Sequence, residues 1–126
     1  MEKQTSLSHS EWQIMECLWE NAHTLMELVD MLGKSVGWSK STVATMVRRM
    51  EEKGLIRYAE QGRTKIFSPA ISREDVTSRE TKSLLQRAYH GSVGMLGNAM
   101  AQRHDLTRED IDELYQILRQ AEEGIQ

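Results

Sequence analysis

"VGWSKSTVATMVRRMEEKGLIRYAEQGRTKIF", residues 36–67, contains the one part of this chain in which basic side chains outnumber acidic ones. Residues 39–65 carry seven Lys and Arg against three acids, a net charge of +4, whereas residues 1–38 sum to −4 and residues 66–126 to −3. The whole chain of 126 residues is acidic, with a formal net charge of −3. This balance argues against general polyanion binding, while a local basic surface can still meet phosphate.

The quoted stretch predicts one helix followed by a β-hairpin. Ser39 is expected to cap the helix and Gly54 to end it. Two short runs rich in Ile, Tyr and Phe flank Gly62, which can take the positive φ of a hairpin loop, and Pro69 cannot extend a strand ladder. The apolar residues of the helix follow the spacing i, i+3, i+4, i+7: Val43, Met46, Val47 and Met50.

The opposite face of this helix is polar. Small hydroxyl residues let a helix approach base edges closely, and Arg can bind guanine or phosphate. Any solvated helix face could carry the same residues, but Arg63 and Lys65 at the hairpin tip add positive charge beside it and favour DNA binding. Glu51 and Glu52, at the far end of the helix, are expected to face away from phosphate. The predicted DNA-binding residues are Ser39, Lys40, Ser41, Thr42, Thr45, Arg48, Arg49, Arg63 and Lys65.

Two further helices are predicted before this stretch. Each opens with a capping box, in which a hydroxyl side chain and an acid three residues later satisfy each other's backbone N–H groups. Ser8 and Glu11 start a helix that follows helical spacing to residue 22, and Thr24 and Glu27 start one that ends at Gly33. Three helices followed by a hairpin is the element order of a winged helix, whose third helix enters the DNA major groove.

Residues 72–126 are predicted to be helical. Ser72 caps a long helix, a stretch with Gly91 and Gly94 interrupts it, residues 95–100 are helical, and Thr107 caps a last helix. Such an extension can bury little of its apolar surface alone, which favours a dimer over a helical cap folded back on the winged helix. The predicted dimerisation residues are Leu84, Leu85, Ala88, Tyr89, Leu96, Ile111, Leu114, Tyr115 and Leu118.

The predicted fold class is therefore mostly α with a small β-hairpin. A winged helix-turn-helix DNA-binding domain is expected at residues 1–71 and a helical dimerisation domain at residues 72–126. We expect a cytoplasmic protein without membrane insertion, since no run reaches the roughly 20 apolar residues that a span needs and the start lacks the apolar core of a signal peptide.

Enzyme chemistry finds no support in the sequence. Cys17 is the single cysteine, which excludes an intramolecular disulfide and a cysteine-cluster metal site, and the four histidines lack ligand spacing. There is no nucleophile-base-acid set and no phosphate-cradling glycine loop. We expect no catalytic residues, no metal and no cofactor.

Three segments resemble the penicillinase repressor family, which includes the β-lactamase and methicillin-resistance repressors and the copper-responsive repressors of copper-transport operons. They are "EWQIMECLWE" (11–20), "WSKSTVATMVRRMEEKGLI" (38–56) and "LTREDIDELYQIL" (106–118). The resemblance implies an inducible transcriptional repressor with a winged helix, which binds palindromic operator DNA as a homodimer and dimerises through its C-terminal helices.

The sequence departs from the two known switches of that family. In antibiotic-responsive members a membrane receptor-protease system leads to cleavage at an Asn-Phe bond, and the matching place here is Ala99-Met100. Copper-responsive members carry Cys-x-Cys motifs near the C-terminus, which are absent here. The inducing signal stays open, and the alternative function is a winged-helix adaptor that binds proteins without sequence-specific DNA binding.

Overall fold

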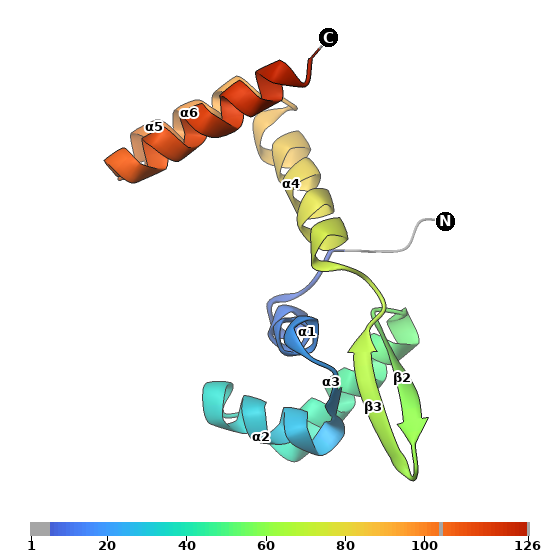
Figure 1. Cartoon of the computed structure of the whole chain (residues 1–126). Coiled ribbons are helices and arrows are strands. Elements are labelled where there is room, and N and C mark those ends of the chain that lie inside the picture. The colour runs from blue at the N-terminus through green and yellow to red at the C-terminus, as the bar shows by residue number, and fades with distance from the viewer. Residues whose placement is uncertain (1–5, 104, 126) are drawn as a thin grey trace. The chain divides into compact units, whose positions relative to one another are not determined.

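The computed structural model describes residues 6–103 and 105–125, and the chain divides into two compact units, Met1–Thr81 and Lys82–Gln126. The predicted domain boundary between residues 71 and 72 lies just before a helix, and the two compact units meet inside that helix, at Thr81 and Lys82. Where the DNA-binding domain ends therefore stays a prediction. The described residues form six helices and three strands (Figure 1): α1 (His9–Glu20), β1 (His23–Thr24), α2 (Leu25–Val36), α3 (Lys40–Lys53), β2 (Ile56–Gln61), β3 (Thr64–Pro69), α4 (Arg73–Tyr89), α5 (Val93–Arg103) and α6 (Arg108–Glu123).

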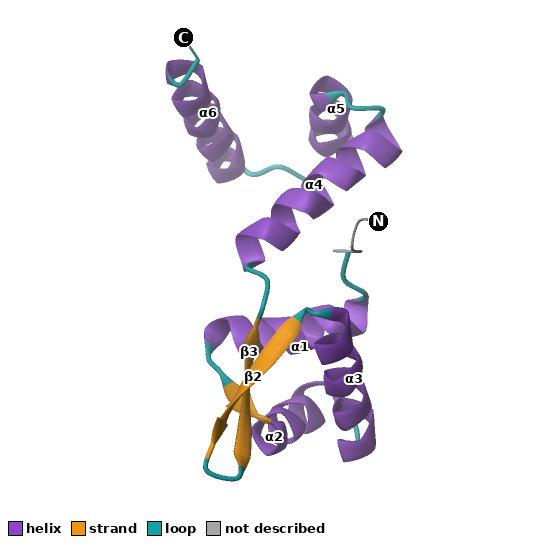
Figure 2. Ribbon diagram, turned by 90° about the vertical axis from the view of Figure 1, so that its right-hand side faces the viewer, coloured by secondary structure: helices purple, strands orange, loops and turns teal. Residues whose placement is uncertain are grey.

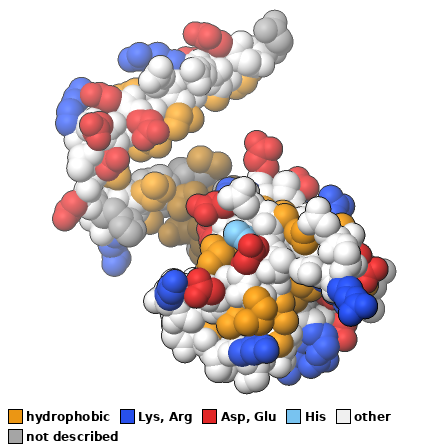
Figure 3. Space-filling view, turned by 60° about the horizontal axis from the view of Figure 1, so that its bottom comes forward, with side chains coloured by type: hydrophobic (Ala, Val, Ile, Leu, Met, Phe, Trp, Pro, Cys, Tyr) orange, Lys and Arg blue, Asp and Glu red, His pale blue; other side chains and the backbone are white. Residues whose placement is uncertain are grey.

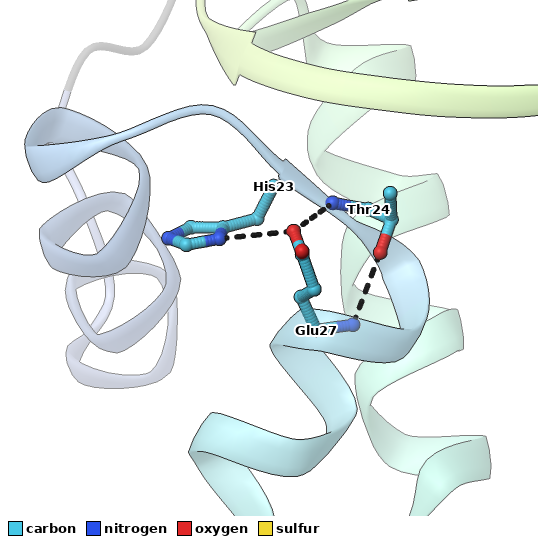
Figure 4. A network of polar contacts seen from close by, with 3 residues as sticks. All are labelled: His23, Thr24 and Glu27. Atoms are coloured by element: carbon cyan, nitrogen blue, oxygen red, sulfur yellow. Dashed lines mark hydrogen bonds and ion pairs between the residues drawn. The ribbon is translucent and has the colours of Figure 1, made fainter. Parts of the chain in front are cut away.

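The predicted capping boxes are confirmed. In α1, the Ser8 hydroxyl accepts the Glu11 N–H and the Glu11 carboxylate accepts the Ser8 N–H, and the reciprocal pair at Thr107 starts α6 in the same way. At α2 a third group joins the box, because the His23 Nδ1 lies 3.2 Å from Glu27 Oε1 (Figure 4). The hydrogen bond from the Thr24 N–H, together with His23, holds the pKa of the Glu27 carboxyl below its ordinary value.

The predicted boundaries of three helices were wrong. The helix α2 continues past Gly33 to Val36 and ends where Gly37 takes a left-handed conformation with φ of 73°, and the Gly37 and Trp38 N–H groups both donate to the Leu32 carbonyl. The helix α1 ends at Glu20, two residues earlier than its apolar spacing indicated. The helix α5 is longer than residues 95–100 at both ends.

The predicted hairpin is confirmed, and a short third strand joins it. The strands β2 and β3 pair antiparallel from Ile56 opposite Pro69 to Gln61 opposite Thr64, and Gly62 in the turn has φ of 66°. The strand β1, which the sequence reading missed, pairs antiparallel with the other edge of β3 and gives the order β1-β3-β2. Figure 2 shows these strands beside the helices α1 to α3 of the first unit.

One hydrophobic core holds the first unit together. All three of its first helices, two strands and the start of α4 contribute to it, so the core fixes α3 relative to the hairpin. Cys17 packs partly buried against it, and burial raises the pKa of its thiol, which is consistent with a packing role. The buried side chains are Leu7, Ile14, Met15, Leu18, Leu28, Leu32, Val43, Val47, Met50, Leu55, Ile56, Phe67 and Val76.

The second unit has a different character, because its apolar side chains remain exposed in the single chain. No side chain of α5 or α6, both of which the structure describes in full, is buried. Of the predicted dimerisation residues, Leu85, Tyr89, Leu96 and Ile111 are partly buried. The other five are exposed: Leu84, Ala88, Leu114, Tyr115 and Leu118.

Candidate nucleic-acid interface

The helix α3 has the two faces that its sequence predicts. Val43, Val47 and Met50 are at most 3% exposed, and Met46 packs partly buried against the same core. On the other side the predicted polar residues are exposed, apart from Thr45, which is partly buried: Ser39, Lys40, Ser41, Thr42, Arg48 and Arg49. The core thus holds the polar face of α3 towards solvent.

The first turn of α3 carries a cluster of hydroxyl groups. The Ser39 hydroxyl accepts the Thr42 N–H at 3.2 Å, and it lies 3.0 Å from the Thr42 hydroxyl and 3.2 Å from that of Ser41. A helix N-terminus presents unpaired N–H groups and the positive end of the helix dipole, which suit an anion such as phosphate. Exposed hydroxyls at this end can exchange their mutual hydrogen bonds for bonds to DNA.

Seven of the nine predicted DNA-binding residues line one of two hollows, and Ser39 and Lys40 line neither. A shallow one on the outer side of α3 is lined by Ser41, Thr42, Thr45, Met46 and Arg49. A larger groove runs between α3, the start of α2 and the hairpin, and it brings together Arg48, Arg63 and Lys65. The larger groove therefore brings one arginine of α3 together with the two cations of the wing.

The larger groove has an apolar floor that the sequence reading missed. Its lining includes Leu25, Val47 and Phe67, with Met26 at 56% exposure. Figure 3 views this end of the first unit, where Lys and Arg side chains border a hydrophobic patch. A signal for Met26 was present, because this residue lies off the apolar stripe by which α2 packs.

Two acids lie closer to the basic groups than predicted. The Glu52 carboxylate is 3.8 Å from the Arg48 guanidinium, and Glu51 lines the same groove as Arg48. We expected both acids to face away from phosphate, and this expectation was wrong at Arg48, beside which both of them lie. Of the predicted DNA-binding cations, Lys40, Arg49, Arg63 and Lys65 have no carboxylate within 4.0 Å among the residues that the structure describes.

One cation of the wing, Lys65, is held by an aromatic side chain. The Lys65 ammonium lies 4.2 Å from the ring centroid of Tyr58, and that ring packs against Phe67 with centroids 5.9 Å apart. A cation over an aromatic face is held in place without losing its charge. Lys65 is thus presented at the surface of the hairpin rather than being neutralised by an acid.

The described part of the chain contains neither a cluster of metal-binding side chains nor a membrane-spanning helix. No group of three or more His, Cys, Asp or Glu side chains that could hold a metal ion occurs among residues 6–103 and 105–125. No helix among these residues is long and apolar enough to span a bilayer.

The three-helix unit with its hairpin and basic groove defines a winged-helix protein with the surface of a DNA-binding domain. A family model for the penicillinase repressor matches residues 7–120, so the chain belongs to the penicillinase repressor family. It is 30% identical over 121 residues to the penicillinase repressor of Bacillus licheniformis, covering 95% of this chain and 94% of that one. It is 24% identical over 120 residues to the methicillin resistance regulatory protein MecI of Staphylococcus aureus strain N315, with 92% and 95% covered.

Solved structures agree with this assignment. The DNA-binding domain of the repressor BlaI has a TM-score of 0.53 and 29% identity, and covers 60% of this chain and 93% of its own. Bacillus licheniformis BlaI, solved as a monomer in complex with the blaP half-operator, has a TM-score of 0.52 and 27% identity, with 59% and 90% covered. These proteins are repressors, as the resemblance implied, and their structures confirm the predicted winged-helix fold. The family is one of transcriptional repressors and not of enzymes, as predicted.

Proposed function

We propose that this chain is a transcriptional repressor that binds palindromic operator DNA as a homodimer. In this proposal α3 lies in the major groove, with Ser41, Thr42, Thr45 and Arg49 near base edges, and the wing lies on the backbone. The observation that carries the proposal is the groove in which Arg48 of α3 meets Arg63 and Lys65 of the wing, in a unit whose core fixes both helix and hairpin. The BlaI half-operator complex supports DNA as the partner.

The residues divide into two roles. Arg49 lines the outer hollow of α3 with the hydroxyl residues, where a guanidinium can form two hydrogen bonds to a guanine edge. Arg63 and Lys65 belong to the wing and bind phosphate, which positions the protein without reading sequence. Ser39 and Lys40 bind phosphate at the N-terminus of α3, and Arg48 contributes less because Glu52 lies beside it.

Fluorescence anisotropy on a selected operator, repeated over a range of salt concentrations, tests these roles. Arg49→Ala should weaken operator binding by about 1–3 kcal/mol and relax the sequence preference. Arg63→Ala should weaken binding to all duplexes alike and lower the steepness of the salt dependence by about one unit. The control is Arg79→Ala, an exposed arginine of α4 outside both hollows. Unchanged affinity in both test variants would show that this surface is not the DNA interface.

The dimer is proposed from the second unit. In α6, Ile111, Leu114, Tyr115 and Leu118 recur at helical spacing, and the last three are 39–62% exposed in the single chain. A stripe of that kind requires a cover in water, and a second copy would supply it through the same residues on both sides. Residues 1–71 would then be the DNA-binding domain and residues 72–126 the dimerisation domain.

Inducible release belongs to the same proposal, with the protein acting in the cytoplasm. The Asn-Phe and Cys-x-Cys features of the family are absent, so the signal need not be a β-lactam or copper. If a receptor-protease system releases the repressor by cleaving it, the mass of the protein should fall when operator affinity is lost under inducing conditions. Loss of affinity at constant mass would replace proteolysis with ligand control.

A further inference from the structure

The walls of the larger groove are held together by the sheet and the core of the first unit. The strand β1 pairs with β3, with Thr24 opposite Ile66, and the same Thr24 caps α2. Leu25 and Met26, the first two residues of α2, therefore start directly beside the hairpin. On the opposite wall, α3 is held in the core by Val47, which is 3% exposed. The groove is thus formed by the first unit alone.

The floor of this groove is apolar and partly open to solvent. Val47 and Phe67 line it from the core, Leu25 is partly buried, and Met26 is 56% exposed. The groove has a volume of about 620 Å³, which lies within the roughly 300–1,000 Å³ of sites that bind small molecules. A DNA phosphate satisfies cations but has no apolar group to place on such a floor. The floor therefore suits a ligand with an apolar body.

The charges at the rim differ between the two walls. On the wing side, Arg63 and Lys65 are exposed and have no carboxylate within 4.0 Å among the described residues. On the α3 side, the Glu52 carboxylate lies 3.8 Å from the Arg48 guanidinium, and Glu51 lines the groove as well. An anionic group is therefore favoured at the wing and disfavoured near the two acids of α3.

We infer that the larger groove binds a small aromatic carboxylate, whose rings pack on the apolar floor while its carboxylate pairs with the wing cations. The sulfur of Met26 and the ring of Phe67 both make favourable contacts with an aromatic ring. The guanidinium of Arg63 can bind a carboxylate through two parallel hydrogen bonds. Such a ligand satisfies the apolar and the positive part of the groove together.

Binding in the groove has a regulatory consequence, and this consequence rests on the proposed function. There, Arg63 and Lys65 bind DNA phosphate, so ligand and operator compete for the same two cations. By mass action, a competing ligand at about ten times its dissociation constant should lower operator affinity about tenfold. The inferred ligand is therefore an inducer that releases DNA without cleavage of the chain.

Isothermal titration calorimetry of 2-naphthoate into the full-length protein tests the site. We expect one molecule to bind per chain with a dissociation constant of about 1 mM or lower, as is usual for a ligand of roughly 13 non-hydrogen atoms. Acetate lacks the rings and 2-naphthylmethanol lacks the charge, so each should bind at least about tenfold more weakly.

Substitutions place the bound molecule in the groove. Met26→Ser and Arg63→Gln should each weaken 2-naphthoate binding at least about fivefold, because one removes part of the floor and the other a cation. The matched controls are Val36→Ser, an exposed apolar residue at the other end of α2, and Arg57→Gln, an exposed arginine of the same hairpin. Neither residue lines the groove, so both controls should bind as wild type does.

Fluorescence anisotropy on a duplex with one half-site, selected by binding from a random-sequence pool, tests the release. We expect 2-naphthoate at about ten times its dissociation constant to lower half-site affinity about tenfold relative to acetate at the same concentration. If wild type does not bind 2-naphthoate, or if Met26→Ser and Arg63→Gln bind it equally well, the inference is wrong and the proposed function stands. Binding in the groove without loss of half-site affinity would overturn the release. If wild type binds no duplex specifically, the proposed function fails, and calorimetry still decides the site.

Discussion

Replacing Glu11 by Gln tests how α3 is held in place. Glu11 is the one buried charged residue among those that the structure describes, at 4% exposure, and its carboxylate joins the start of α1 to the last turn of α3. It accepts the Ser8 N–H at 2.9 Å as part of the α1 capping box, and it pairs with the Lys53 ammonium of the last turn of α3 at 2.5 Å. The Gln side chain has the same shape and can still accept the Ser8 N–H, so the substitution removes the pairing with Lys53.

The expected loss of stability follows from these contacts. A hydrogen bond to a charged group contributes about 1.5–3 kcal/mol, but the Lys53 side chain is 59% exposed and regains water when its partner is neutral. We therefore expect a cost of about 1–2 kcal/mol for Glu11→Gln. In a unit of this size each kcal/mol lowers the melting temperature by roughly 4–8 °C. Glu11→Ala, which also removes the capping interaction, should cost about 1 kcal/mol more.

The same contact makes stability depend on pH. Burial raises the pKa of the Glu11 carboxyl, but the hydrogen bonds from Lys53 and Ser8 outweigh it and bring the pKa below the ordinary 4.5. A depressed folded-state pKa stabilises the protein above 4.5, and this contribution is lost as the pH falls through the lower folded-state value. The deficit of Glu11→Gln should thus be complete at pH 7 and shrink below pH 4.5.

Urea unfolding at fixed protein concentration, followed by tryptophan fluorescence, measures the deficit, because Trp12, Trp19 and Trp38 all pack against the core of the first unit. The control is Glu20→Gln, an exposed acid on the same helix, which should leave the midpoint unchanged. A Glu11→Gln protein as stable as wild type at pH 7, or a deficit that persists unchanged at pH 3, would show that the pairing of Glu11 with Lys53 does not stabilise the fold.

Two other predictions concern the end of α2 and the second unit. Gly37→Ala should cost about 1–2 kcal/mol because Gly37 has φ of 73°. Gly33→Ala should instead stabilise by about 0.5–1 kcal/mol, because Gly33 lies inside the helix and an added Cβ would be in ordinary contact, 3.7 Å from the Trp38 carbonyl oxygen. Equal effects of the two substitutions in urea unfolding would contradict the boundary of α2. Leu118→Asp should dissociate the dimer in sedimentation equilibrium while Leu118→Met keeps it, and a dimer that survives the Asp would place the interface elsewhere.

Local signals of the fold could be read from the sequence, and signals between distant segments could not. The capping boxes were predictable because both partners lie within three residues of each other. The strand β1 was missed because its two residues pair with Ile66 and Phe67, more than forty positions away. Gly33 and Gly37 both lie near the end of α2, and only the backbone shows which of them takes the left-handed conformation.

The candidate site follows the same division. The buried and exposed faces of α3 were predictable from helical spacing alone. The pair of Arg48 and Glu52 was predictable in the same way, because residues four apart lie side by side on a helix. The groove was not predictable, because it forms only where the start of α2 and the hairpin meet α3. Met26 lines it from a position off the packing stripe of α2, and the spacing alone did not show what this side chain would face.

The central claim, that this protein reads a DNA sequence, is tested most directly by selecting duplexes from a random-sequence pool with the full-length protein at physiological salt. We expect enrichment of one motif in two inverted copies, bound at least about a thousandfold more tightly than random duplex. A pool without any enriched motif, bound no more tightly than random duplex, would contradict the claim and favour the protein-interaction adaptor.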